Sequence, residues 1–352
     1  MAARSAIGLD IGTSGVRAAE VSFGRGQATL ARFGQVALPE GAVVDGVVAD
    51  RPTVVEALKS LWRATHFSSR QVVLGVGNQR VIVRQADLPW LPANEIRASL
   101  PYQVQELVPM PVDQALLDFL PIEEFTGGTG GRMVRGLLVA AAREMVTTNV
   151  ATVEQAGLRP SMVDLTAFAV VRAMGSHDNL GLDAATEVLV DVGARITNVV
   201  IHTGGVPQFV RLLLLGGQDV TDALATRLGC SPTEAEALKQ ELSARVADEQ
   251  HQSAARIVAA STSSFVDEIR GSVDYFLATS PTTSPARLVL TGGGARLAGL
   301  ADELAAATRL PVTVGTPLAS MKVGKTGLSE EQLRYVEPLV TVPVGLALGA
   351  AA

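Results

Sequence analysis

The stretch IGLDIGTSGVRAAEV, residues 7–21, is an apolar run ending in Asp10, a glycine-containing turn and a second apolar run. The stretch VLVDVGARITNVVI, residues 188–201, repeats this design around Asp191. Each predicts two strands joined by a tight turn, which directs backbone N–H groups and hydroxyls toward a phosphate. The Asp of each hairpin can hold a cation through water. Two such hairpins in one chain predict paired lobes that close on a single polyphosphate.

The composition agrees with a two-lobed α/β protein. The 352 residues exceed the usual size of one hydrophobic core. Apolar residues make up 47% of the chain and charged residues 18%, so a large core can be buried. Aromatic residues are scarce, at 4%. The packing of helices onto sheets must therefore come mainly from Ala, Val, Leu and Gly, as in α/β proteins.

Charge and cysteine content narrow the functional classes. A net charge of −6 and the lack of a basic stripe disfavour nucleic-acid binding. A single cysteine, Cys230, excludes an intramolecular disulfide framework and suits a reducing compartment. The start of the chain lacks the apolar run of a signal peptide, and the apolar tail from Pro338 is too short for a membrane span. We therefore expect a cytoplasmic protein with no direct membrane insertion.

The chain divides into three predicted parts. Residues 1–85, with 161–186 and 331–352, form the core of the first lobe, and residues 187–330 form the second lobe. Residues 86–160 differ in pattern and predict an inserted subdomain of strands and helices. Within it, Asn94 is placed to cap a helix that Pro101 should kink.

Several motifs predict a nucleotide site. Asp10 and Asp191 are the candidate Mg²⁺ ligands. The second strand of the later hairpin opens near Thr197, and glycines at 292–294 let backbone approach a flat nucleoside. Gly216 and Gly217 precede a helix start, which suits an anion, and Glu236 and Lys239 share one helical face that can reach a ribose or adenine. The remaining candidates for contact with the polyphosphate lie in the two hairpins: Gly12, Thr13, Ser14, Arg17, Gly193, Ala194 and Arg195.

This set of motifs, in this order, resembles the actin-like ATPase superfamily, which includes actin, sugar kinases and the division protein FtsA. Within it the chain is most similar to the PilM family of type IV pilus assembly proteins. The carrying stretches are IGLDIGTSGVRAAEV, VDLTAFAVVRA, GCSPTEAEALK and, most specifically, the 88–113 block LPWLPANEIRASLPYQVQELVPMPVD. The resemblance implies an actin-like fold with an FtsA-like inserted subdomain, and ATP with Mg²⁺ as cofactors.

The resemblance also implies a partner. A PilN-like membrane protein would place its short cytoplasmic N-terminal segment in a groove near residues 88–110, between the first lobe and the inserted subdomain. The protein would then serve the pilus assembly platform beside motor components, peripheral to the inner membrane through that partner. A sugar or acetate-type kinase and an FtsA-like division filament protein are the alternatives. The tail VTVPVGLALGAA lacks the basic amphipathic helix that the division protein needs.

Three positions leave alternatives open. Asp164 either orients an attacking water or caps the helix that follows it. Arg17, where the family commonly has Lys, either contacts a phosphate or is a strand-surface charge. Arg195 stands where family members often have Gly, and either adds a cation beside the phosphates or crowds them. Whether ATP is hydrolysed is also open, and any turnover should be slow.

Overall fold

Two sheets of the same design form the centre of the molecule. The computed structural model describes residues 4–24, 26–128, 130–175, 185–244, 251–280 and 283–351. The first sheet has the order β10-β6-β1-β2-β3-β16. Its strands are β1 (Arg4–Ile11), β2 (Gly15–Phe23), β3 (Thr29–Ala37), β6 (Gln71–Val76), β10 (Arg159–Leu165) and β16 (Lys322–Val323).

The second sheet repeats the first. Its order is β13-β12-β11-β14-β15. In both sheets three antiparallel strands are followed by two parallel ones, so that β11 corresponds to β1 and β14 to β6. The predicted duplication and the α/β class are therefore confirmed. The strands are β11 (Thr186–Val192), β12 (Thr197–Thr203), β13 (Val206–Leu213), β14 (Arg287–Thr291) and β15 (Val312–Val314).

Two helices lie between the sheets, α4 (Thr166–Met174) and α10 (Thr341–Gly349). Val170 of α4 and Leu346 of α10 belong to one buried cluster with Leu189 of the second sheet and Val73 of the first. The two helices approach very closely, because a Cβ added at Gly345 would lie 1.9 Å from the carbonyl oxygen of Ala169. This packing joins the lobes beneath the cleft described below.

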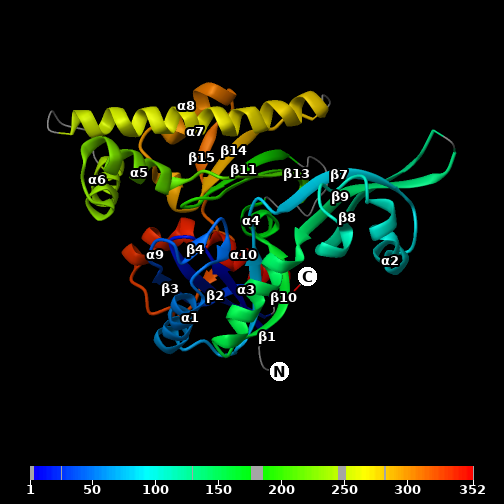
Figure 1. The fold of residues 1–352 in the computed structure, drawn as a ribbon, viewed down its shortest axis with the longest axis horizontal. Coiled ribbons are helices and arrows are strands. Elements are labelled where there is room, and N and C mark those ends of the chain that lie inside the picture. Colours follow the sequence, from blue (N-terminus) through cyan, green and yellow to red (C-terminus); the bar gives the residue numbers. More distant parts are fainter. Residues whose placement is uncertain are drawn as a thin grey trace.

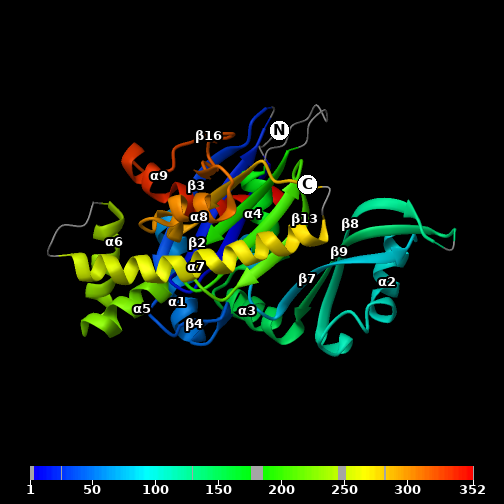
Figure 2. The same ribbon diagram turned by 90° about the horizontal axis from the view of Figure 1, so that it is seen from above.

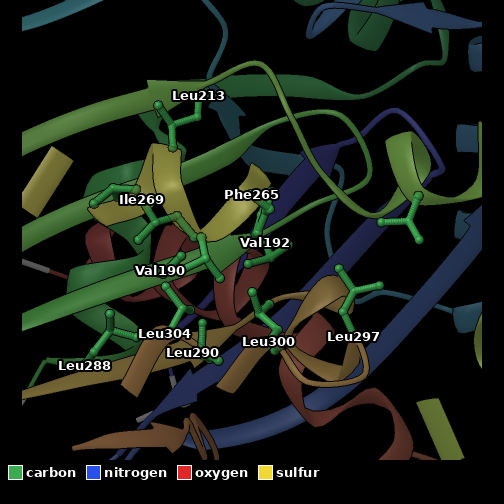
Figure 3. Packing of buried hydrophobic residues seen from close by; sticks show 14 of the residues in the cluster. Val190, Val192, Leu213, Phe265, Ile269, Leu288, Leu290, Leu297, Leu300 and Leu304 are labelled. Atoms are coloured by element: carbon green, nitrogen blue, oxygen red, sulfur yellow. The ribbon is translucent and has the colours of Figure 1, made fainter. Parts of the chain in front are cut away.

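The outer faces of the sheets are covered by separate helices. The first sheet carries α1 (Arg51–Thr65) and α3 (Arg143–Gln155), whose apolar residues pack on Leu9 and Leu74. The second carries α5 (Gly217–Leu228), α6 (Pro232–Ala244), α8 (Leu300–Thr308) and the long helix α7 (Gln252–Thr279). Figure 3 shows Phe265 and Ile269 of α7 directed at Val190 and Val192 of β11. The central strands of each sheet are thus buried on both faces.

A separate three-stranded sheet, in the order β7-β9-β8, projects from the side of the molecule opposite α5 and α6 (Figures 1 and 2). It is built from β7 (Val81–Pro89), β8 (Ala115–Thr126) and β9 (Arg132–Ala142), and α2 (Ala93–Gln103) packs on it. This sheet begins at Val81, ahead of the predicted boundary at residue 86. Helix α3, which was assigned to the insert, instead packs with α1 on the first sheet.

The shorter elements complete the first lobe. They are the pair β4 (Val43–Val44) and β5 (Val47–Val48), and helix α9 (Glu330–Val336) ahead of α10. Asn149 of α3 holds the turn between β4 and β5, accepting from Val48 N at 3.2 Å and donating to Gly46 O at 3.2 Å. Within the described ranges, no helix is both long and apolar enough to cross a membrane.

Candidate functional site

The two Asp-Gly hairpins have matching backbone geometry. In the first, Gly12 N donates to Gly15 O at 3.0 Å, and in the second Gly193 N donates to Ile196 O at 3.0 Å. In both, the Asp stands two residues before the turn glycine. Asp10 pairs in register with Arg17, and Asp191 with Asn198. The hairpins therefore differ mainly in the residue that lies across the strand from the carboxylate.

Both hairpins open into one cleft of about 1,110 Å³ between the lobes. Its walls include most of the residues that the sequence predicted to contact the nucleotide or Mg²⁺. These are Asp10, Gly12, Thr13, Ser14, Arg17, Asp191, Gly193, Ala194, Arg195, Gly217, Glu236, Lys239, Gly292, Gly293 and Gly294. Segments from the whole length of the chain thus meet at one surface of sufficient size for a nucleoside triphosphate.

The two carboxylates are electrostatically coupled. The pKa of Asp191 is raised to about 6, because burial and the nearby Asp10 carboxylate outweigh a hydrogen bond from Asn198 Nδ2 at 3.1 Å. Burial also raises the pKa of Asp10, and the Arg17 guanidinium partly offsets this. Two carboxylates that repel one another within one cleft favour a bound cation, which would remove that repulsion.

Arg17 belongs to the cleft. Its Nη2 donates to Ser14 Oγ at 3.2 Å and its Nη1 lies 4.0 Å from Asp10 Oδ2. Arg17 Nε is buried and has no hydrogen-bond partner among the described residues. A buried donor with no acceptor is costly, so an anion beside it would be stabilising. Of the two alternatives for Arg17, this placement favours contact with a phosphate.

The start of α5 differs from the expected anion site. Gly217 N donates to Gly193 O at 2.9 Å and Gln218 N to Ala194 O at 2.8 Å. A Cβ added at Gly216 would lie 2.4 Å from Gly193 O, so only glycine allows this approach. The donors that were expected to face an anion therefore bind the second hairpin. They fix the position of that hairpin on α5.

Glu236 and Lys239 form a network at the side of the cleft. Lys239 Nζ donates to Glu236 Oε2 at 2.6 Å, to Thr221 Oγ1 at 2.9 Å and to Gly217 O at 2.9 Å. Burial alone would raise the pKa of Glu236, but hydrogen bonds from Lys239, Thr221 and Gln240 lower it below its usual range. Glu236 is thus an anionic acceptor, as recognition of a hydroxyl requires.

The glycine turn at 292–294, which follows β14, packs against Asp191 and Val192 of the second hairpin. Gly292 has φ of 81°, and a Cβ there would lie 2.7 Å from Asp191 Oδ1 and 2.5 Å from Val192 O. At Gly294 a Cβ would lie 2.2 Å from Val192 Cγ1. Glycine is needed here because the backbone passes so close to the hairpin. This places the turn within the same cleft as the carboxylates.

Three predicted residues lie outside the cleft lining. Thr197 is buried and donates through Oγ1 to Leu215 O at 2.9 Å, and Gly216 packs as described above. Asp164 is ion-paired with Arg172 and accepts from Leu165 N at 2.7 Å. Burial raises its pKa, Arg172 opposes this, and Asp118 of β8 adds to it. Asp164 is therefore held by Arg172 of α4 and by the backbone at the start of that helix, and this placement gives no support for a role in orienting water.

Several residues that line the cleft were not predicted from the sequence. Thr166 donates to Asn198 Oδ1 at 3.3 Å and so links the lobes beside Asp191. Arg296 lies 4.6 Å from the ring centre of Tyr335 and donates to Arg334 O at 3.3 Å, which also crosses between lobes. Their residue types alone do not mark them as site residues, and only their partners across the chain give them a place in the site.

The donor set fits Mg²⁺ with a polyphosphate. Among the described residues, no group of three or more His, Cys, Asp or Glu side chains is arranged so that it could hold a metal ion. Two carboxylates are the number that commonly holds Mg²⁺ when most of its ligands are water and phosphate oxygens. The orphaned Arg17 Nε and the coupled carboxylates both match such a ligand.

Comparisons with known proteins agree with this architecture. A solved PilM–PilN type IV pilus biogenesis complex matches with a TM-score of 0.86 and 26% identity, over 99% of this chain and 98% of that chain. Cell division protein FtsA of Bacillus subtilis (strain 168) is 24% identical over 338 residues, 84% of this chain and 74% of FtsA. MreB5 of Spiroplasma citri bound to ADP shares the fold, with a TM-score of 0.54 and 13% identity over 99% and 98% of the two chains.

The fold is therefore that of the actin-like ATPases, as the order of motifs predicted. The family described as type IV pilus assembly protein PilM matches residues 8–351, which is nearly the whole chain. The chain belongs to this PilM family of type IV pilus assembly proteins.

Proposed function

We propose that this protein is the actin-like, ATP-binding component of a type IV pilus assembly platform and that it binds the N-terminal segment of a PilN-like membrane protein. The observation that carries this proposal is the family match, together with the likeness to a PilM–PilN complex over both whole chains. A sugar or acetate kinase is not favoured, because the match extends over the inserted subdomain as well as the lobes.

Nucleotide binding is the first part of the proposal. The coupled pair Asp10 and Asp191 holds Mg²⁺ through water, and the turns at 12–14 and 193–195 bind the phosphates. Glu236 and Lys239 bind the nucleoside, whose face lies on the glycine turn at 292–294. Support comes from the shared cleft, the raised pKa of both carboxylates and the unpaired Arg17 Nε. Bound nucleotide favours one lobe arrangement over another.

The partner segment is the second part. We place it between the first lobe, made by 1–85, 161–186 and 331–352, and the inserted subdomain, on the side of residues 88–110. Strand β10 is at the edge of the first sheet, and its Met162 and Val163 are 43% and 37% exposed. An unpaired strand edge with exposed apolar side chains suits an extended peptide. Membrane association then requires only the partner.

A second surface competes for the peptide. A depression of about 470 Å³ lies between the insert and α7, and is lined by Ile82, Arg84, Glu106, Leu107, Val108, Pro109 and Tyr275. It shares residues 106–109 with the predicted region but faces the second lobe. Substitutions at the exposed residues Val163 and Tyr275 distinguish the two candidate peptide sites.

Calorimetry with a synthetic peptide of the PilN-like cytoplasmic segment from the same genome tests the proposal. We expect Val163→Glu to weaken binding by about tenfold or more, because it puts a charge on the apolar edge. Tyr275→Glu is the matched control and should leave affinity unchanged. The reverse pattern would move the peptide to the α7 depression, and no binding by the wild-type protein would contradict the partner assignment.

A further inference from the structure

Arg195 occupies a defined position at the tip of the second hairpin. Its Nη1 lies 2.8 Å from Asp219 Oδ1 and its Nη2 lies 2.5 Å from Asp222 Oδ2. These two acids stand one turn apart on α5. The guanidinium is therefore held against α5 by two ion pairs.

The two acids are themselves held in place. Asp219 Oδ2 accepts from Gly216 N at 2.7 Å, and Asp222 Oδ1 accepts from Gln218 Nε2 at 3.2 Å. Arg195 is 29% exposed and so has lost part of its freedom. A planar guanidinium with two fixed carboxylates keeps one orientation at little further entropic cost.

The same hairpin tip reaches the opposite lobe. Arg195 Nη2 lies 3.8 Å from Oε1 of Glu40, which follows β3 in the first lobe. The next residue, Ile196, stands beside Gly46, where an added Cβ would lie 3.1 Å from Ile196 Cδ1. The first-lobe segment that it meets is anchored to α3 through Asn149. One charged and one apolar contact thus cross the phosphate end of the cleft.

We propose that residues 195–196 form an interlobe clasp, with Arg195 as a positioning residue that holds Glu40 and so favours the closed lobes. Closure keeps both phosphate hairpins near one polyphosphate, so the clasp lengthens nucleotide residence. This effect rests on the proposed nucleotide function. The lobe arrangement itself depends on the clasp with or without nucleotide.

The solvent exposure of Glu40 limits the free energy that the clasp contributes. Glu40 is 71% exposed, and solvent screens such a pair to a contribution of roughly 0.2–1 kcal/mol. Loss of that contribution corresponds to a change of up to about fivefold in an equilibrium constant. Added salt should weaken the clasp, because the pair lies at the surface.

The test compares Glu40→Gln, Arg195→Gln and the double variant. Glu40→Gln removes only the cross-lobe contact and leaves Arg195 with Asp219 and Asp222. Glu56→Gln is the control, since Glu56 pairs within α1 with Lys59 at 2.9 Å. Spin labels at Ala64→Cys and Thr226→Cys, both exposed and one in each lobe, report the interlobe distance in a Cys230→Ala background.

We expect Glu40→Gln and Arg195→Gln each to lengthen the label distance without nucleotide. Each should also speed dissociation of a fluorescent ATP analogue, by up to about fivefold. The double variant should do no more than the larger single change, since both single changes remove the same cross-lobe contact between Arg195 and Glu40. Unchanged distances for Glu40→Gln, or fully additive effects, would overturn the clasp. If the wild-type protein does not bind the analogue, the nucleotide function fails, and the label distances still decide the clasp.

Discussion

At the scale of single residues, the two hairpins show how one motif can give different electrostatics. The sequence predicted equal roles for Asp10 and Asp191, and both do line the cleft. Their cross-strand neighbours differ, however, because register places a cation at Arg17 and a neutral amide at Asn198. The cross-strand neighbour of each Asp follows from the length of its hairpin turn. The degree of burial that raises each pKa does not follow from the hairpin, because it depends on the opposite lobe.

Asp191→Asn should stabilise the protein at pH 8 in metal-free buffer, by roughly 1–3 kcal/mol in the free energy of unfolding. The folded-state pKa of Asp191 is raised to about 6, above the unfolded value of 3.8. The stabilising contribution of the protonated carboxyl is therefore fully present below pH 3.8. That contribution is lost as pH rises through about 6. Asparagine has no charge to bury at any pH. The advantage should therefore disappear by about pH 4, as urea titrations at both pH values can measure.

Asp50→Asn is the control for this prediction. Asp50 is exposed, and hydrogen bonds from the side chain and backbone of Thr53 lower its pKa. Removal of that charge should give no gain at pH 8. An Asp191→Asn protein that is no more stable than wild type at pH 8 would contradict the assignment of a costly buried carboxylate.

At the scale of elements, local sequence predicts helix ends well where a side chain can satisfy the backbone. The box at Ser329 and Gln332 caps α9, with Gln332 N donating to Ser329 Oγ at 3.2 Å, as its spacing predicts. The expected cap at Asn94 is wrong, since α2 begins at Ala93 after Pro92. Pro101 lies within α2, which ends soon after it at Gln103. Competing starts only one or two residues apart cannot be separated by composition alone.

The close packing of α10 on α4 gives a prediction at this scale. Gly345→Ala should lower the free energy of unfolding by roughly 1–3 kcal/mol, because its Cβ would lie 1.9 Å from Ala169 O. Gly271→Ala in α7 is the matched control, since nothing lies within 4 Å of its added Cβ. That change should stabilise by roughly 0.5–1 kcal/mol through helix propensity. Denaturation midpoints that shift in the same direction for both variants would contradict this packing.

At the scale of the whole molecule, the repeat of two Asp-Gly hairpins was sufficient to predict paired lobes. The structure adds an order of five strands that the two sheets share, with β16 as an extra edge strand in the first, and the two helices between the sheets. Two features were beyond the sequence. Helix α3 packs on the first sheet although it follows the inserted strands directly, and Arg195 reaches Glu40 across the cleft. Both depend on contacts between distant segments, which no local pattern records.

We propose that one Mg²⁺–polyphosphate is held between both acidic hairpins. A crystal structure with Mg²⁺ and a non-hydrolysable ATP analogue tests it most directly. We predict one ion between the carboxylates of Asp10 and Asp191, with the phosphates on the turns at 12–14 and 193–195. An analogue whose phosphates contact only one hairpin, or that binds outside the cleft, would contradict the account.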